Sequence, residues 1–176
     1  MTIPEAPANS CGPRFVAPGQ GTKHPAPGGD IIVGKLSSAH SGGTFQCVED
    51  EVAPGGGPPL HVHDREDEFF YVLEGEVTFW VCEKGDRTGK SGKPVVAAKG
   101  ASVFGPRGTA HTFKNCAQCM ARMLVVVNPG GNFEAFFAKV CANDASGNSP
   151  SPELLIERTI KSAADFGITI LGPSPL

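Results

Sequence analysis

The sequence lacks three features that would place it in well-known classes of protein. No apolar run approaches the roughly 18 residues that a membrane-spanning helix needs. Its 15 Lys and Arg residues are outnumbered by 18 Asp and Glu, and no basic stripe is visible, so we expect no nucleic-acid partner. The start, MTIPEAPANSCGP, has no charged-then-apolar leader. We therefore expect a cytoplasmic protein without a membrane partner, whose six cysteines are thiols.

Turn-forming residues are abundant instead, with 23 glycines and 16 prolines spread along 176 residues. Short apolar runs lie between them, among them DIIVGKL, TFQCVEDEV, EFFYVLEG, EVTFWVCE, AHTFKN and ARMLVVVN. Such runs separated by turns are typical of a mostly β protein. Many short strands would leave open sheet edges unless the sheet closed or doubled, so a small barrel or jelly roll is the predicted fold.

The composition changes twice along the chain. Residues 1–29 are rich in Pro and Gly and are predicted to form an irregular N-terminal arm. Residues 30–128 contain the strands of the barrel, with a solvated hairpin loop at 82–94. Residues 129–176 are predicted to be a helical C-terminal extension that packs on the barrel.

Two short helices are predicted in this extension. The first, NFEAFFAKVC, has Asn132 as its expected N-cap. The second begins after Ser151, a residue suited to capping, with Pro152 in its first turn. Gly167 is expected to end it, and the short apolar segment GITILGP then either pairs with a sheet edge or packs on the barrel.

Metal-ligating residue types cluster in the stretch PPLHVHDREDEFFYVLEG, residues 58–75. His61 and His63 point the same way in an extended strand, because side chains alternate between faces. Glu68 has the wrong parity to continue that strand, and the acidic DRED run makes a good turn. We therefore predict that the histidines end one strand and that Glu68 begins the next.

His111 is a third available imidazole, at the start of the run HTFKN after the turn FGPRG. Three imidazole nitrogens and one carboxylate oxygen make a good site for a divalent first-row metal. Glu66 and Asp67 are alternative carboxylates, but Glu68 is preferred and the other two are expected to be solvent-facing turn charges.

Two motifs resemble those of the cupin family. The first is similar to G-x5-HxH-x4-E-x6-G, with matches at Gly55, His61, His63, Glu68 and Gly75. The second is similar to G-x5-PxG-x2-H-x3-N, with matches at Gly100, Pro106, Gly108, His111 and Asn115. The resemblance implies a double-stranded β-helix, or jelly-roll barrel, with one metal held by His61, His63, Glu68 and His111. Cupins often form homodimers, so a homodimer is expected.

The segments VVVNPGGNFEAFFAKV and AADFGITILGP are also similar to those of bacterial single-domain cupins that resemble flavonol (quercetin) 2,3-dioxygenases. This resemblance implies that a flavonol-like enol chelates the metal, that Glu68 acts as the base and that O2 is a substrate. Nickel, manganese, cobalt, iron, copper or zinc would fit the ligands. The same ligands also suit an isomerase, epimerase or cyclase that uses no O2, or a cupin that only binds a small molecule.

An aromatic substrate needs an apolar pocket. By strand alternation, Phe70 shares the face of Glu68 and Phe113 shares that of His111, so both are candidate substrate-binding residues. Phe133, Phe136 and Phe137 lie in the first predicted helix and are candidates for a lid. The pair Cys116 and Cys119 is interpreted as two loop thiols, because a single CxxC is weak support for a zinc site.

Overall fold

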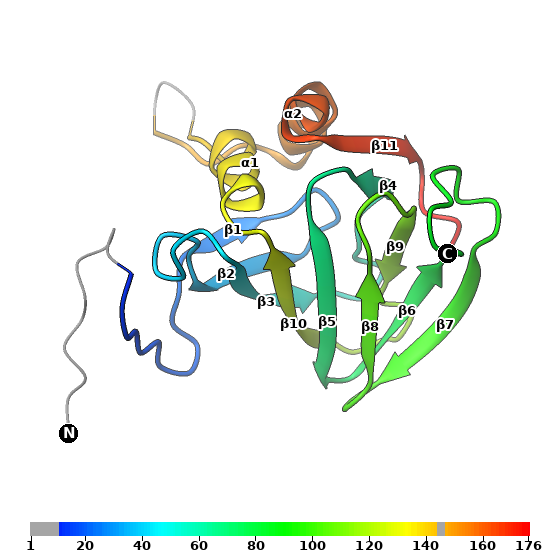
Figure 1. Ribbon diagram of the computed structural model, residues 1–176, viewed down its shortest axis with the longest axis horizontal. Coiled ribbons are helices and arrows are strands. Elements are labelled where there is room, and N and C mark those ends of the chain that lie inside the picture. Colours follow the sequence, from blue (N-terminus) through cyan, green and yellow to red (C-terminus); the bar gives the residue numbers. More distant parts are fainter. Residues whose placement is uncertain (1–10, 144–146) are drawn as a thin grey trace.

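The computed structural model describes residues 11–143 and 147–176; the first ten residues of the expected N-terminal arm lie outside this part of the chain. Two antiparallel sheets face each other, with two helices at one end of them (Figure 1). The prediction of a mostly β jelly roll with two short C-terminal helices is confirmed.

The larger sheet has six strands. Its spatial order is β1 (Lys23–Pro25), β2 (Ile31–Leu36), β3 (Gln46–Val52), β10 (Ala121–Asn128), β5 (Asp67–Glu74) and β8 (Ser102–Gly105). The smaller sheet has five strands. Its order is β11 (Ile168–Gly172), β4 (Leu60–His63), β9 (His111–Lys114), β6 (Glu76–Val81) and β7 (Lys93–Ala98). The non-consecutive neighbours show that the chain repeatedly crosses between the sheets.

The core lies between the inner faces of the two sheets. Along β3 and β10 buried residues alternate with more exposed ones, as a strand with one covered face requires. The buried positions of β10 include Met123, Val125 and Val127, and those of β3 include Val48 and Val52. The hydrophobic alternation of these two strands therefore fixes which side chains face the interior.

The sheets extend beyond residues 30–128 at both ends of the range. Lys23–Pro25, in the predicted irregular arm, pairs with β2. Ile168–Gly172, in the predicted helical extension, pairs with β4. The apolar segment near the C-terminus thus adds an edge strand next to the strand that contains His61 and His63, which shields the backbone of that strand from solvent.

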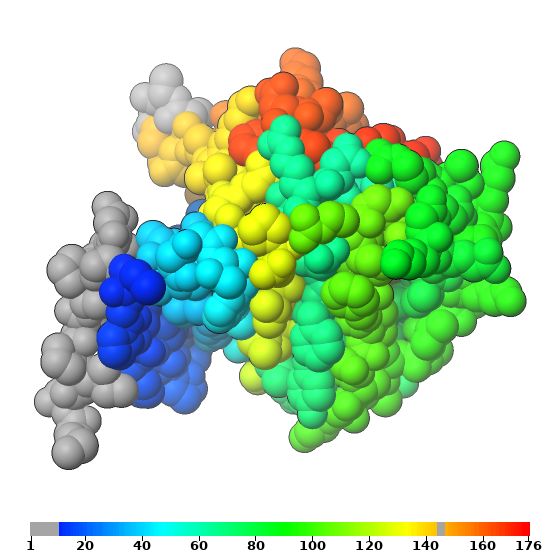
Figure 2. Space-filling model, in the orientation of Figure 1, coloured from blue at the N-terminus to red at the C-terminus, as the bar shows by residue number. Residues whose placement is uncertain are grey.

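The helices are α1 (Asn132–Val140) and α2 (Pro152–Ser162), which a 3₁₀ turn, η1 (Ala163–Phe166), follows. Ser151 caps α2 as predicted, since its Oγ accepts a hydrogen bond from the backbone N–H of Leu154 at 3.3 Å. Gly167 ends the helical segment with a φ of 70°, a left-handed conformation that suits glycine. The helices and β11 cover one end of the two sheets (Figures 1 and 2).

Asn132 is not the N-cap of α1, contrary to the prediction. Gly131 occupies that position, with a φ of 107° and no side-chain capping bond. The Asn132 side-chain amide instead donates hydrogen bonds to Glu66 Oε1 at 2.6 Å and to the carbonyl of Phe166 at 2.7 Å. The Asn132 side chain therefore makes tertiary hydrogen bonds and does not cap the helix.

Other predicted features are found in the described residues. The loop between β6 and β7 spans residues 82–92, close to the predicted hairpin loop. Cys116 and Cys119 are exposed free thiols. No helix in the described part of the chain is long and apolar enough to cross a bilayer.

Candidate metal centre

Four side chains from three strands meet inside the fold. His61 and His63 lie on β4, Glu68 is the second residue of β5, and His111 begins β9. Their nearest ligand atoms all lie within 4.8 Å of one another, and all four side chains are buried. The predicted set is therefore brought together.

The strands that position these side chains end and begin where strand alternation predicted. β4 ends at His63 and β5 begins at Asp67, so the polar DRED run forms the reversal between the strands. His61 lies directly across from His111 in the antiparallel pair formed by β4 and β9. A two-residue spacing on one strand and a cross-strand neighbour thus place three imidazoles on the same inner surface.

Backbone carbonyls orient two of the imidazole rings. Nδ1 of His61 lies 2.8 Å from the carbonyl oxygen of Pro59, and Nδ1 of His111 lies 3.0 Å from that of Thr109. A carbonyl oxygen only accepts hydrogen bonds, so Nδ1 carries the proton and Nε2 presents a lone pair in the neutral ring. Both lone pairs then point toward the centre of the cluster, as they do in histidines that bind metals.

The inward-facing atoms are acceptors placed too close together without a cation. His61 Nε2 lies 3.1 Å from His63 Nε2, and His111 Nε2 lies 2.8 Å from Glu68 Oε2. Ligands bonded to one first-row ion at about 2.1 Å are about 3 to 4 Å apart, which is close to these separations. The donor set and its spacing therefore fit a divalent transition metal.

The ionisation of the cluster also suits a cation. Burial, together with the neighbouring His111 and His63, lowers the pKa of His61 to about 3, so this ring is neutral at pH 7. Burial alone would raise the pKa of Glu68, but the surrounding histidines lower it to about 2. A neutral imidazole and an ionised carboxylate are the forms that bind a metal, so at neutral pH these two ligands need not lose a proton first.

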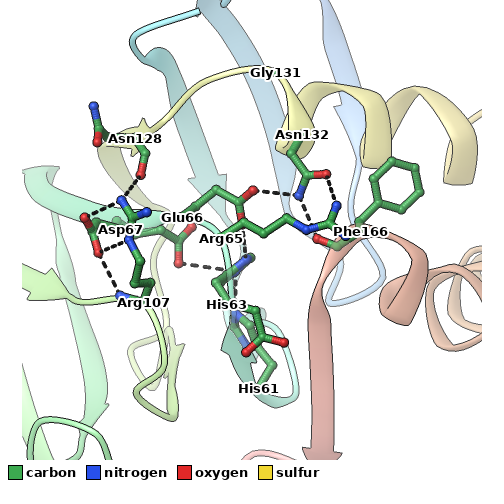
Figure 3. A network of polar contacts seen from close by, with 12 residues as sticks. His61, His63, Arg65, Glu66, Asp67, Arg107, Asn128, Gly131, Asn132 and Phe166 are labelled. Atoms are coloured by element: carbon green, nitrogen blue, oxygen red, sulfur yellow. Dashed lines mark hydrogen bonds and ion pairs between the residues drawn. The ribbon is translucent and has the colours of Figure 1, made fainter.

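Glu66 is buried, and the prediction that it is a solvent-facing turn charge is wrong. Only 1% of its surface is exposed. Its Oε2 lies 3.5 Å from His63 Nδ1, and its Oε1 accepts the hydrogen bond from Asn132 at the start of α1. Figure 3 shows Glu66 between His63 and Asn132. Glu66 therefore orients His63, a candidate metal ligand, and connects it to the helix that covers the site.

Replacing Glu66 by glutamine is expected to lower metal affinity about 10- to 100-fold. Mutation of a group that hydrogen-bonds to a metal-binding histidine typically lowers metal affinity by this factor. The amide keeps the shape of the side chain but removes the charge that favours a proton on His63 Nδ1. Competition with a metal-chelating dye measures the affinity. An unchanged dissociation constant would contradict the role given to Glu66.

Asp67 lies at the rim of the site rather than among the ligands. Its carboxylate accepts hydrogen bonds from Arg107, with Arg107 Nη2 at 2.8 Å and the Arg107 backbone N–H at 2.8 Å (Figure 3). Both side chains are partly exposed, so solvent weakens this ion pair. The pair holds the FGPRG turn, which precedes His111, against the start of β5.

An apolar cavity of about 100 Å³ adjoins the cluster. His61, His63 and Glu68 form part of its wall. Aromatic rings form much of the rest, namely Phe70, Phe113, Phe133, Phe136 and Phe137. These five phenylalanines are the two candidate pocket residues of the strands and the three candidate lid residues of the first helix, and all of them line one cavity. Phe104, which precedes the turn, is 57% exposed on the outer surface.

Asp30 and Asp50 are cavity-lining residues that were not predicted from the sequence. They are 3% and 2% exposed, and the Oδ1 atom of each has no hydrogen-bond partner among the described residues. The signal that was available is the alternation of QCVEDEV, which places Asp50 on the same inward face as Val48 and Val52.

Burial raises the pKa of Asp30 to about 7, and burial with the charges of Asp30 and Glu68 raises the pKa of Asp50 well above its ordinary value. An unfolded aspartic acid releases its proton near pH 4, whereas these two keep theirs in the folded state. Their contribution to stability is therefore greatest below about pH 4 and is lost as the pH rises toward and through 7.

Replacing Asp50 by asparagine is expected to be more favourable for the free energy of unfolding at pH 8 than at pH 4.5, because the amide never ionises, whereas burial opposes ionisation of the aspartate. Chemical unfolding of both proteins at the two pH values measures this difference. If the free energies of unfolding of the variant and the wild type differ by the same amount at both pH values, Asp50 ionises normally in the folded protein.

Comparisons with known proteins agree with the fold. Residues 48–127 match the cupin domain family. The polyketide cyclase RemF from Streptomyces resistomycificus is similar in structure, with a TM-score of 0.54 and 26% identity over 65% of this chain and 78% of that chain. A recombinant oxalate oxidase in complex with glycolate has a TM-score of 0.55 and 22% identity, covering 90% of this chain and 86% of that chain. No curated protein matches the chain. The resemblance to flavonol dioxygenases stays a prediction.

Proposed function

We propose that this chain, whose residues 48–127 match the cupin domain family, is a metal-dependent enzyme that cleaves a flavonol-like or other enolised aromatic molecule with O2. The observation that carries the proposal is the junction of two features. Four buried side chains that could hold a metal meet beside an apolar cavity. Three of them, His61, His63 and Glu68, form part of its wall, and five phenylalanine rings form another part. Metal chemistry and aromatic binding would therefore take place in one enclosed space.

A bound divalent ion would supply Lewis acidity, which lowers the pKa of a hydroxyl group placed next to it. The residues that would hold it are His61, His63, Glu68 and His111. If the bound ion accepted two further ligands, vicinal oxygens of a substrate could bind to it.

Glu68 is the residue that we assign as the base. Its carboxylate lines the cavity, and its pKa of about 2 keeps it ionised across the physiological range. A weak base is sufficient when the acidity of the substrate hydroxyl has been increased, since proton transfer depends on the difference between the two pKa values. Glu68 would accept this proton and leave the substrate as an enolate.

The phenylalanine rings would hold the aromatic part of the substrate and exclude water. Phe70 and Phe113 form one wall, with ring centroids 5.9 Å apart. Phe133 and Phe137 of α1 pack with a centroid separation of 4.8 Å at the helical end. A dry cavity protects an enolate from being reprotonated before it reacts.

The similarity to a polyketide cyclase favours a second candidate, in which the enolate reacts within its own molecule and O2 is not used. The ligands, the base and the aromatic cavity would serve this reaction equally well. A cyclase or isomerase gives a product of unchanged mass or one that has lost water, whereas a dioxygenase adds both atoms of O2 to its products.

Oxygen consumption separates these candidates. The untagged protein, loaded in turn with each candidate metal, is incubated with a panel of flavonols while dissolved O2 and product masses are recorded. Stoichiometric O2 uptake supports the dioxygenase. New products without uptake support the cyclase or isomerase, and a ligand that binds without any product supports a binding protein.

A further inference from the structure

We propose that Asp30 and Asp50 form a carboxyl pair that binds a hydroxyl group at the part of the substrate remote from the metal centre. The inference rests on the proposed function only for its substrate class, a hydroxylated aromatic molecule. It assigns a binding role to two residues outside the metal-ligand set, and so specifies which aromatic molecules the cavity prefers.

The two carboxyl groups are neighbours on the inner face of the larger sheet. Asp50 lies opposite Ile32 in the register of β2 and β3. Asp30 precedes β2 and has the same parity as Ile32, so its side chain belongs to the same face. Asp30 and Asp50 are therefore diagonal cross-strand neighbours, a relation in which side chains on one face reach each other.

The pair is separate from the metal ligands. Glu68 is in register with Val127 of β10, and Val127 is in register with Gln46 of β3. Asp50 lies four residues beyond Gln46, which corresponds to about 13 Å along the strand. A ligand that reached both the metal centre and the pair would therefore extend along the cavity, as a molecule with two linked rings does.

One oxygen of each carboxyl group lacks a hydrogen-bond partner in the described part of the chain. Oδ1 of each is buried without a hydrogen-bond partner, and no ion pair with a described residue involves either side chain. A buried polar atom without a hydrogen bond is unfavourable, so two such oxygens on one cavity wall need an explanation. A bound ligand with a complementary polar group provides one.

A third unpartnered atom lies on the same cavity. Oγ1 of Thr159, on α2, is buried and has no hydrogen-bond partner among the described residues. The other lining residues outside the metal cluster are almost all apolar, including the phenylalanines described above. Three buried polar atoms without partners, on Asp30, Asp50 and Thr159, therefore belong to residues that line a largely hydrophobic cavity, and a few such polar groups in an apolar pocket are typical of a ligand site.

The chemistry of the pair favours a hydroxyl group. Burial keeps at least one of the two carboxyl groups protonated near neutral pH, since the pKa of Asp30 is about 7 and that of Asp50 is also raised. One protonated and one ionised carboxyl group together donate and accept hydrogen bonds. A phenolic hydroxyl both donates and accepts as well, and it brings no charge into the apolar cavity.

The direct test compares two flavonols that share the chelating 3-hydroxy-4-keto group: quercetin, with hydroxyls on its other rings, and 3-hydroxyflavone, without them. Metal-loaded protein is expected to bind quercetin at least about 10-fold more tightly, since a site built for a hydroxyl discriminates against a ligand that lacks one. Asp50→Asn and Asp30→Asn should each reduce this preference several-fold, with little change in affinity for 3-hydroxyflavone or in metal content.

A matched control is Glu51→Gln. Glu51 is adjacent to Asp50 on β3, but its carboxylate lies on the outer face, 3.5 Å from Lys23 Nζ. This variant should keep the full preference for quercetin. Asparagine is nearly the size of aspartic acid, so each variant is expected to keep the fold, and circular dichroism of each variant checks this.

Resorcinol separates a failure of this inference from a failure of the proposed function. Its two hydroxyls are too far apart to chelate one metal, and it has no enolisable carbonyl under these conditions. We expect resorcinol to bind wild-type protein in ligand-observed NMR and to lose most of its binding in Asp50→Asn. That result supports the carboxyl pair even if no flavonol is turned over. Turnover of quercetin with a preference that both aspartate variants retain would overturn the inference and leave the proposed function intact.

Discussion

Replacing His111 by alanine is expected to lower the affinity for a divalent metal by at least about 100-fold. Removing a group that only hydrogen-bonds to a ligand lowers metal affinity by up to about 100-fold, and removing the ligand itself should lower it at least as much. His111 is the only ligand from β9, and its ring faces Glu68 across the site at 2.8 Å. Its loss leaves the metal with ligands from β4 and β5 alone. Elemental analysis after dialysis, and competition with a chelating dye, measure the change.

His24→Ala is the control for this experiment, because His24 lies on β1 and is not part of the cluster. The control should keep its metal, and both variants should keep the β-sheet spectrum of the wild type. The fold should survive the loss of His111 because the core between the sheets consists mainly of valine, phenylalanine and other apolar side chains. Equal metal retention in His111→Ala and wild type would show that His111 is not a ligand.

Replacing Glu68 by glutamine is expected to lower turnover by at least about 100-fold, which is the lower part of the range for removing a general base. The amide oxygen still reaches toward the metal, but the neutral side chain cannot take a proton from the substrate. Rates should be measured at saturating metal, so that weaker metal binding does not contribute to the loss.

Glu74→Gln is the matched control, because Glu74 ends the same strand and its side chain is 64% exposed. It should turn over substrate at the wild-type rate. A Glu68→Gln variant that is as active as this control would exclude Glu68 as the base, although not as a ligand.

The positions of the four candidate metal ligands in the fold could be predicted from the sequence because they depend on local rules. Strand parity places His61 and His63 on one face, and a polar four-residue run is enough to identify the reversal before Glu68. His111 was assigned to the start of a strand from the Pro- and Gly-containing turn before it. Each of these inferences uses residues close together in the chain, and the structure confirms the strand boundaries.

Glu66 shows where local reasoning fails. Within the DRED run it has the composition of a solvated turn, but a segment 66 residues later packs over it and contributes Asn132. The same contact removes Asn132 from its expected capping role. Neither residue could be assigned from its neighbours in sequence, because the deciding partner comes from the helical end of the molecule.

Asp50 is an intermediate case. The alternation of its strand pointed it inward, yet an aspartate flanked by Glu49 and Glu51 is easily interpreted as one of three surface charges. In the structure its neighbours form outward ion pairs, with Lys35 at 3.4 Å from Glu49 and Lys23 at 3.5 Å from Glu51. Periodicity was therefore a better guide than charge, because the pleat of the strand fixes the face.

The central claim is that His61, His63, Glu68 and His111 bind a single metal ion. The most direct measurement is anomalous diffraction at the absorption edge of the metal found in the purified protein. The account predicts one anomalous peak per chain, within about 2.3 Å of a nitrogen of each histidine and an oxygen of Glu68. A peak elsewhere, or a stoichiometric metal that persists when His61 and His111 are both replaced by alanine, would contradict it.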